Sequence, residues 1–130
     1  MRKCWIGMFV LLLVLCLCGC AVRMDAQSTG KVVYDAYGTK FEDELTADEM
    51  TAVADVLDGK WAEAAILGRP SCGFDENVAI IIDGRRLAMA CGGCGTLWDV
   101  GTSRYIHISN AEQDVLEEIF TSRGGEFPCI

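Results

Sequence analysis

The sequence predicts an α+β domain in which a small antiparallel sheet of about three strands packs against two helices and is stapled by disulfides. Three observations lead to this prediction. Two segments combine a helix capping box with an apolar stripe, an Asp-Gly pair separates two runs of β-forming residues, and cysteines are spread over the second half of the chain.

The first 19 residues have the three-part pattern of a signal peptide. Arg2 and Lys3 form a cationic start, an apolar stretch of about a dozen residues follows, and the small residue Gly19 precedes Cys20. The apolar stretch is shorter than the roughly 20 residues that a membrane-spanning helix needs. The Ala-x-Ala-like site of a plain secreted protein is missing near residues 16–22. We therefore predict that residues 1–19 are removed by cleavage before Cys20.

The residues Leu17-Cys18-Gly19-Cys20 resemble the lipobox of bacterial lipoproteins, although Cys18 replaces the more usual Ala or Ser. The resemblance implies that Cys20 begins the mature chain and carries a diacylglycerol (a palmitate-type anchor) on its sulfur. Two acyl chains give stable attachment, whereas a single chain binds reversibly. The expected location is the cell membrane or envelope, lipid-anchored, on the extracytoplasmic face.

The remaining chain has the size of one domain. Residues 20–30 lack apolar periodicity and are interpreted as the lipidated N-terminus and a tether, and residues 31–130 as a single small α+β domain. The signal segment takes two of the 11 basic residues and none of the 19 acidic ones, which leaves a net charge of −10. Such a domain repels nucleic acid, so we expect no nucleic-acid partner and attachment to the membrane through the lipid on Cys20.

The first half of the domain contains one clear element. Residues 31–41 alternate loosely and predict a short strand or an extended arm. Thr46 and Glu49 have capping-box spacing, and Gly59 is a typical helix end. The apolar stripe between them comprises Met50, Val53, Val56 and Leu57. Trp61, which follows this helix, is expected to pack as a core or lid aromatic.

Residues 77–91 predict a β-hairpin that turns at Asp83-Gly84. In this register Ile82 meets Arg85, Ile80 meets Leu87 and Val78 meets Met89. The face that should contact the helices carries Val78, Ile80, Ile82, Leu87, Met89 and Cys91.

The end of the chain predicts a third strand at 105–108 and a second helix. Ser109 and Glu112 repeat the capping-box spacing, and Gly124-Gly125 ends the helix. Its expected buried stripe comprises Val115, Leu116, Ile119 and Phe120.

Beyond Cys20, the mature chain holds four cysteines, and an even number outside the cytoplasm suggests two disulfides. The hairpin register brings Cys72 close to Cys94 if a bulge at Gly92-Gly93 shifts the parity. Cys91 lies on the core face, where the tail could bring Cys129. We therefore favour the pairs Cys72–Cys94 and Cys91–Cys129.

Two other interpretations of these cysteines stay open. Cys91-Gly92-Gly93-Cys94 is a C-x-x-C motif, which thiol oxidoreductases place at a helix N-terminus, but Gly-Thr-Leu-Trp follows here. A zinc site of four cysteines usually needs two tight pairs, and this chain has one.

The run Cys72-Gly73-Phe74-Asp75, the Asp83-Gly84 hairpin and the run Cys94-Gly95-Thr96-Leu97-Trp98-Asp99 resemble a loose group of small secreted or lipid-anchored bacterial domains. The resemblance covers about residues 45–130. It supports the Cys72–Cys94 pair and implies no activity.

The sequence offers no catalytic, cofactor-binding or metal-binding set of residues. Trp98 and Tyr105 are candidates for an aromatic surface that binds an unknown protein or glycan. The leading hypothesis is a non-enzymatic, surface-anchored binding module. The alternatives are an inhibitor of an extracellular enzyme that presents the loop near 92–99, and a thiol-redox protein that uses Cys91 and Cys94.

Overall fold

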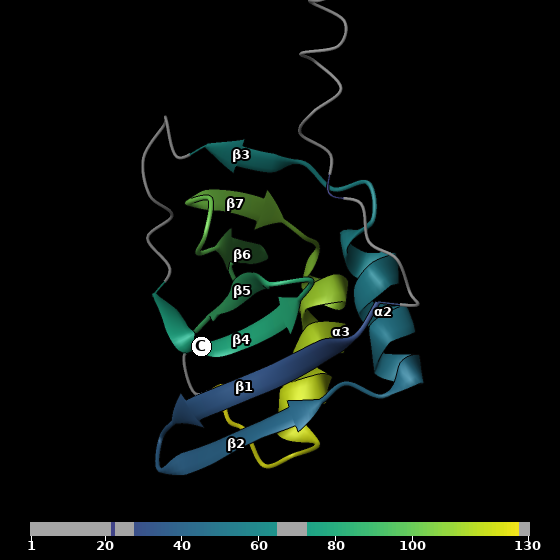
Figure 1. Ribbon diagram of the computed structural model, residues 1–130. Coiled ribbons are helices and arrows are strands. Elements are labelled where there is room, and N and C mark those ends of the chain that lie inside the picture. The colour runs from purple at the N-terminus through teal and green to yellow at the C-terminus, as the bar shows by residue number, and fades with distance from the viewer. Residues whose placement is uncertain (1–21, 23–27, 65–72, 128–130) are drawn as a thin grey trace, which may run out of the picture.

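The computed structural model describes Val22, residues 28–64 and residues 73–127. In this part of the chain seven strands form one antiparallel sheet, and two helices accompany it (Figure 1). The elements are β1 (Gly30–Ala36), β2 (Thr39–Glu44), α2 (Ala47–Leu57), β3 (Ala62–Ala64), β4 (Phe74–Ile82), β5 (Arg85–Ala90), β6 (Thr96–Asp99), β7 (Arg104–His107) and α3 (Asn110–Thr121).

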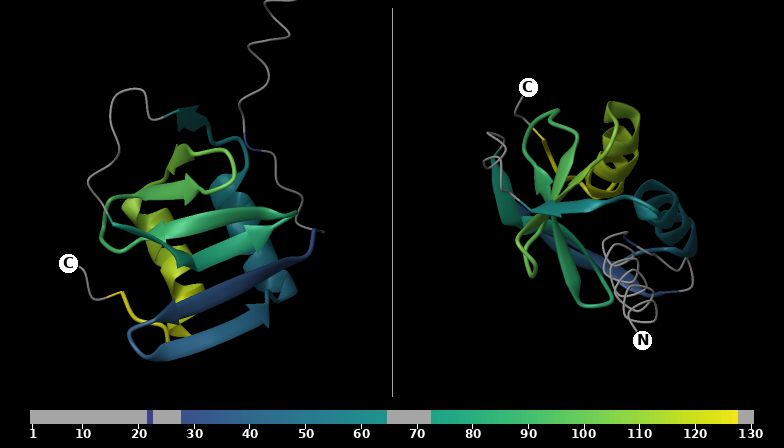
Figure 2. Two further views of the ribbon diagram at one scale, coloured as in Figure 1. Left: turned by 60° about the vertical axis from the view of Figure 1, so that its left-hand side comes forward. Right: turned by 90° about the horizontal axis from the view of Figure 1, so that it is seen from above.

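The strands lie in the order β2-β1-β4-β5-β6-β7-β3, so β2 and β3 are the two edges of the sheet. The helix α2 connects these two edge strands, and α3 follows β7 and returns to contact β1. Both helices cover the same face, as the view from above shows (Figure 2). No helix in the described part of the chain is long and apolar enough to cross a membrane.

The prediction of about three strands is wrong, because the described sheet has seven. Residues 31–41 belong to a hairpin of β1 and β2 that turns at Tyr37-Gly38, a pair that is not a typical turn signal. Strand β3 has only three residues and β6 only four, which is too short for a visible alternation of apolar and polar residues.

The expected disulfide staple is not found between any two residues that the structure describes. Cys91 and Cys94 are each in the disulfide-bonded state, while Cys72 and Cys129 lie outside the described residues. The partners of Cys91 and Cys94 lie outside the described residues, so the proposed cysteine pairs stay predictions.

The hairpin predicted around Asp83-Gly84 is confirmed as β4 and β5. Ile82 pairs with Arg85 and Ile80 with Leu87, as expected. The register then shifts, because Phe74 pairs with Ala90 whereas Ala79 pairs with Ala88. This shift in strand register lies between Phe74 and Ala79 of β4, and not at Gly92-Gly93. Strand β4 therefore contains extra residues that have no partner position on β5.

Both predicted helix starts are confirmed, and each has a complete capping box. The apolar face of the hairpin joins the helices in one core, as expected, except that Cys91 is only partly buried and is not part of this core. Two predicted burials are wrong: Val115 is 40% exposed, and Trp61 is 56% exposed. Gln113 is buried on α3 instead, because its amide has hydrogen-bond partners in a neighbouring loop.

An ion pair fastens the start of α2 to the end of α3. The Nη1 and Nη2 atoms of Arg123 donate to the two carboxylate oxygens of Glu49 at 2.7 and 2.8 Å. The hydrogen bond from Arg123 lowers the pKa of Glu49 below its ordinary value. Both side chains are largely buried, so the pair is screened little by solvent.

Candidate functional site

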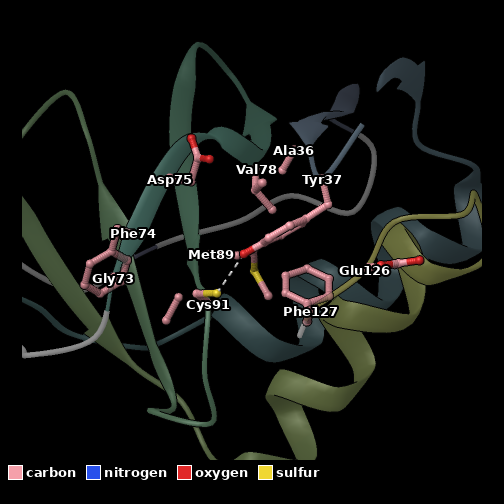
Figure 3. Close-up of a pocket in the computed structure, with 11 residues that line it drawn as sticks. Ala36, Tyr37, Gly73, Phe74, Asp75, Val78, Met89, Cys91, Glu126 and Phe127 are labelled. Carbon is pink, nitrogen blue, oxygen red and sulfur yellow. Dashed lines mark hydrogen bonds between the residues drawn. The ribbon is translucent and has the colours of Figure 1, made fainter. Parts of the chain in front are cut away.

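An apolar pocket lies where four parts of the chain meet (Figure 3). They are the β1–β2 turn, the first half of β4, the last residues of β5 and the C-terminal segment. Its volume is about 190 Å³. The apolar part of its lining comprises Ala36, Phe74, Val78, Met89, Ala90 and Phe127. An apolar cavity of about 150 Å³ accepts a benzene molecule, so this pocket has room for one aromatic or branched aliphatic group.

Tyr37 borders the pocket from the β1–β2 turn, and its ring extends over Met89 toward Cys91 (Figure 3). Its hydroxyl lies 3.2 Å from the Cys91 sulfur, yet the residue is 58% exposed. The backbone of Tyr37 has a φ of 51°, in the left-handed region. A bulky residue there costs about 1–2 kcal/mol relative to an ordinary conformation. A strained, exposed aromatic beside a pocket marks a functional candidate.

The C-terminal wall of the pocket, formed by Glu126 and Phe127, is fixed by a buried tyrosine. The Tyr34 hydroxyl donates to the Glu126 carbonyl oxygen at 2.8 Å and accepts from the Glu126 backbone N–H at 2.9 Å. Phe127 packs edge-on against the rings of Tyr34 and Phe120. The C-terminal segment is thereby held against the sheet, so this side of the pocket is pre-formed.

The charges around the pocket are acidic. Asp75 and Glu126 lie on different sides of it, and no basic residue lines it among the residues described (Figure 3). One oxygen of Asp75 accepts from the Asn77 backbone N–H at 2.8 Å, which fixes the side chain. Both acidic residues are exposed at the rim of the pocket, which suits an apolar group in the pocket with a cationic neighbour outside it.

The predicted aromatic residues Trp98 and Tyr105 are brought together elsewhere. They are cross-strand partners on β6 and β7, and their strand neighbours Leu97 and Ile106 belong to the core, so alternation places them on the other face of the sheet. Phe74 joins them, with ring centroids 6.2 Å from Trp98 and 5.6 Å from Tyr105. Tyr105 is only 5% exposed, so these rings pack mainly against one another.

The segment between β5 and β6, which contains Cys91 and Cys94, is held by α3. The Gln113 side chain donates to the Gly92 carbonyl oxygen at 3.0 Å and accepts from the Gly95 N–H at 2.8 Å. The C-x-x-C motif of Cys91 and Cys94 therefore connects two strands and does not begin a helix. It differs in this from thiol oxidoreductases, which place the motif at a helix N-terminus.

His107 links strands on the same face. Its Nδ1 lies 3.3 Å from the Thr96 hydroxyl oxygen, and its Nε2 lies 3.4 Å from a Glu63 oxygen. The arrangement resembles a nucleophile with its base, but Thr96 is 4% exposed. A hydroxyl beneath the surface is a poor nucleophile for an external substrate, and the contacts tie β6, β7 and β3 together.

Sequence reasoning missed Tyr37, Asp75 and Glu126 as site residues. A signal for Tyr37 was available, because Tyr37-Gly38 interrupts an alternating segment as a two-residue turn would. The other two are brought to the pocket by the irregular stretch of β4 and by the bonds of Tyr34, which local patterns do not reveal.

No protein-family model, no curated protein and no solved structure matches this chain. Its function is therefore argued from its own residues.

Proposed function

We propose that the chain is a membrane-anchored, extracytoplasmic binding module without catalytic activity. Its pocket receives an apolar side chain of a partner protein, next to a lysine or arginine of the same partner. The anchor is the lipid on Cys20, which the lipobox-like residues Leu17–Cys20 support.

The observation that carries the binding proposal is the conformation of Tyr37. Its left-handed backbone is unfavourable for a tyrosine, and its ring borders the pocket while staying 58% exposed. The two-residue turn alone would be formed better by Asn-Gly or Asp-Gly. The ring supports a role in contact with a partner, where tyrosine provides a large rigid surface with little entropy loss.

The preference for a cationic neighbour follows from the lining. Asp75 and Glu126 offer two carboxylates on different sides of the apolar floor. Exposed ion pairs contribute about 0.2–1 kcal/mol each, which corresponds to roughly a fivefold preference at most per carboxylate. The apolar group then supplies most of the affinity, and the charges supply selectivity.

Nuclear magnetic resonance titration with short peptides tests this function. The probes are acetyl-Gly-Phe-Lys-Gly-amide, its Phe-Glu counterpart and its Gly-Lys counterpart. We expect the Phe-Lys peptide to shift the methyl signals of Met89 and Val78, the Phe-Glu peptide to bind more weakly, and the Gly-Lys peptide to leave these signals unchanged. Tyr37→Asn should weaken the binding, whereas the control Asp83→Asn at the other hairpin turn should not.

Two results would contradict the proposal in different ways. Unchanged Met89 and Val78 signals with every phenylalanine peptide would show that the pocket does not bind such a group. If the Phe-Lys and Phe-Glu peptides bind equally well, and Asp75→Asn and Glu126→Gln change neither affinity, the proposed preference for a cationic neighbour is wrong. Labelling with palmitate tests the anchor separately, and a Cys20→Ser chain that still incorporates label would refute it.

A further inference from the structure

The N-terminal segment is attached to the domain close to the expected lipid. The Val22 N–H donates to the Lys60 carbonyl oxygen at 2.7 Å, and the Gly59 N–H donates to the Val22 carbonyl oxygen at 2.8 Å. The Val22 side chain is 2% exposed and belongs to the core. Within the expected tether of residues 20–30, Val22 is thus a fixed point.

The distance from this point to the lipid is limited by the covalent chain. Cys20 precedes Val22 by two residues. Consecutive Cα atoms are 3.8 Å apart, so the two Cα atoms are separated by no more than roughly 7 Å. A diacylglycerol on Cys20 therefore joins the molecule beside the connection between α2 and β3, at one edge of the sheet.

An exposed tryptophan lies at the same connection. Trp61 directly follows Lys60, whose carbonyl oxygen binds Val22, and it is 56% exposed. The indole ring combines an apolar body with one N–H donor, and tryptophan is enriched at the headgroup level of membranes for this reason. Trp61 therefore has the chemistry for headgroup contact at the point where the lipid is attached.

The opposite edge of the sheet carries more negative charge than the β3 edge, where Glu63 is the one charged residue of the strand. Strand β2 carries Glu42, Asp43 and Glu44 in succession, and Lys40 is its only basic residue. The acidic edge is repelled by anionic headgroups, which turns it away from the bilayer. The Tyr37 turn, which borders the pocket, connects β2 to β1 on that distant side (Figure 1).

We propose that the β3 edge rests on the bilayer with Trp61 in the headgroup region, and that the β2 edge and the Tyr37 pocket point away from it. The proposal rests on the lipidation of Cys20 in the proposed function. It gives the anchored domain a defined orientation: the lipid and Trp61 form one contact with the membrane, and the pocket stays open to a partner.

Fluorescence quenching of the lipidated mature chain, which begins at Cys20, tests this orientation. The protein is reconstituted into phosphatidylcholine–phosphatidylglycerol vesicles, with or without lipids brominated near the top of the acyl chains. The Trp61 contribution is the difference between the native chain and Trp61→Phe, so Trp98 need not be altered. We expect this contribution to shift to shorter wavelength on reconstitution and to lose most of its intensity with brominated lipid.

A matched probe at the far edge provides the control. Tyr37 and Trp61 are exposed to a similar extent, 58% and 56%. In the double variant Trp61→Phe, Tyr37→Trp, the added tryptophan is expected to emit at long wavelength and to be unaffected by bromine. The unlipidated Cys20→Ser chain mixed with the same vesicles should show no shift.

The outcomes separate the orientation from the anchor. Mass spectrometry of the N-terminal peptide first shows whether Cys20 carries a diacylglycerol; a peptide without it would overturn the anchor and the orientation together. With the lipid present, an unquenched Trp61 would overturn the orientation alone. Equal quenching of both edge probes would show a domain that tumbles on its anchor, which also contradicts the proposal.

Discussion

The two tight hairpin turns of the sheet have almost the same backbone and very different residues. Tyr37 and Gly38 have φ angles of 51° and 80°, and Asp83 and Gly84 have φ angles of 50° and 76°. Both are two-residue connections between antiparallel neighbours. Aspartate tolerates the left-handed region well, whereas tyrosine does not. Asp83 is thus favourable in its turn, whereas the turn itself does not explain why a tyrosine stands at position 37.

The two residues also differ in their surroundings. Asp83 accepts a hydrogen bond from the Ser28 hydroxyl at 3.1 Å, an exposed contact between residues 55 positions apart in the sequence. Tyr37 extends over the apolar pocket and contacts the Cys91 sulfur (Figure 3). The strain at Tyr37 is small beside the whole free energy of folding, so a functional benefit can maintain it.

The largest effect is expected at another left-handed residue, Gly95, which lies outside the two hairpin turns. A Cβ at Gly38 or Gly84 would meet open space, whereas a Cβ at Gly95 would overlap the Ile108 carbonyl oxygen. Gly95→Ala should lower the free energy of unfolding by about 3 kcal/mol or more, because strain and overpacking add. Gly38→Ala and Gly84→Ala should each cost about 1 kcal/mol. Urea denaturation of the three variants checks this order, and equal losses would contradict it.

The same contrast explains which parts of the fold were predictable. The capping residues Thr46 and Ser109 and the turn residues Asp83-Gly84 act locally, so the sequence reveals them. Tyr37 was not recognised as a turn residue because tyrosine is not among the residues that favour a two-residue turn. Gln113 is buried in place of Val115 because its amide binds a loop that is distant in sequence. Local patterns predict the helices well, but they do not predict edge strands or sites built from several segments.

A test of intermediate size uses the Glu49–Arg123 pair, which lies in the helix layer. The lowered pKa of Glu49 means that the pair stabilises the fold above the ordinary glutamate range of about 4.3. This contribution is lost as the pH falls through the lowered pKa. Arg123→Met should cost about 1–2 kcal/mol at pH 7 and much less at low pH.

The measurement is urea denaturation of both chains as a function of pH. Combined with Tyr37→Asn, the effect of Arg123→Met should be additive within about 0.5 kcal/mol, because Tyr37 contacts Cys91 whereas Arg123 binds Glu49 and Asp43. A large coupling would show that the strain at Tyr37 is transmitted into the helix layer, and the two turns could then not be compared as independent units.

The smallest changes in stability are expected when the residues of the two turns are exchanged. These variants test most directly whether Tyr37 is unfavourable in its turn. Tyr37→Asn should raise the free energy of unfolding by about 1 kcal/mol, because asparagine fits the left-handed position. Asp83→Tyr should lower it by about the same amount. If Tyr37 is kept for binding, Tyr37→Asn gives a more stable protein that binds the phenylalanine–lysine peptide less well, as expected where a strained functional residue is relieved. A Tyr37→Asn chain that is destabilised by more than Asp83→Tyr would instead show that the ring mainly supports the fold, through its packing on Met89 and Cys91.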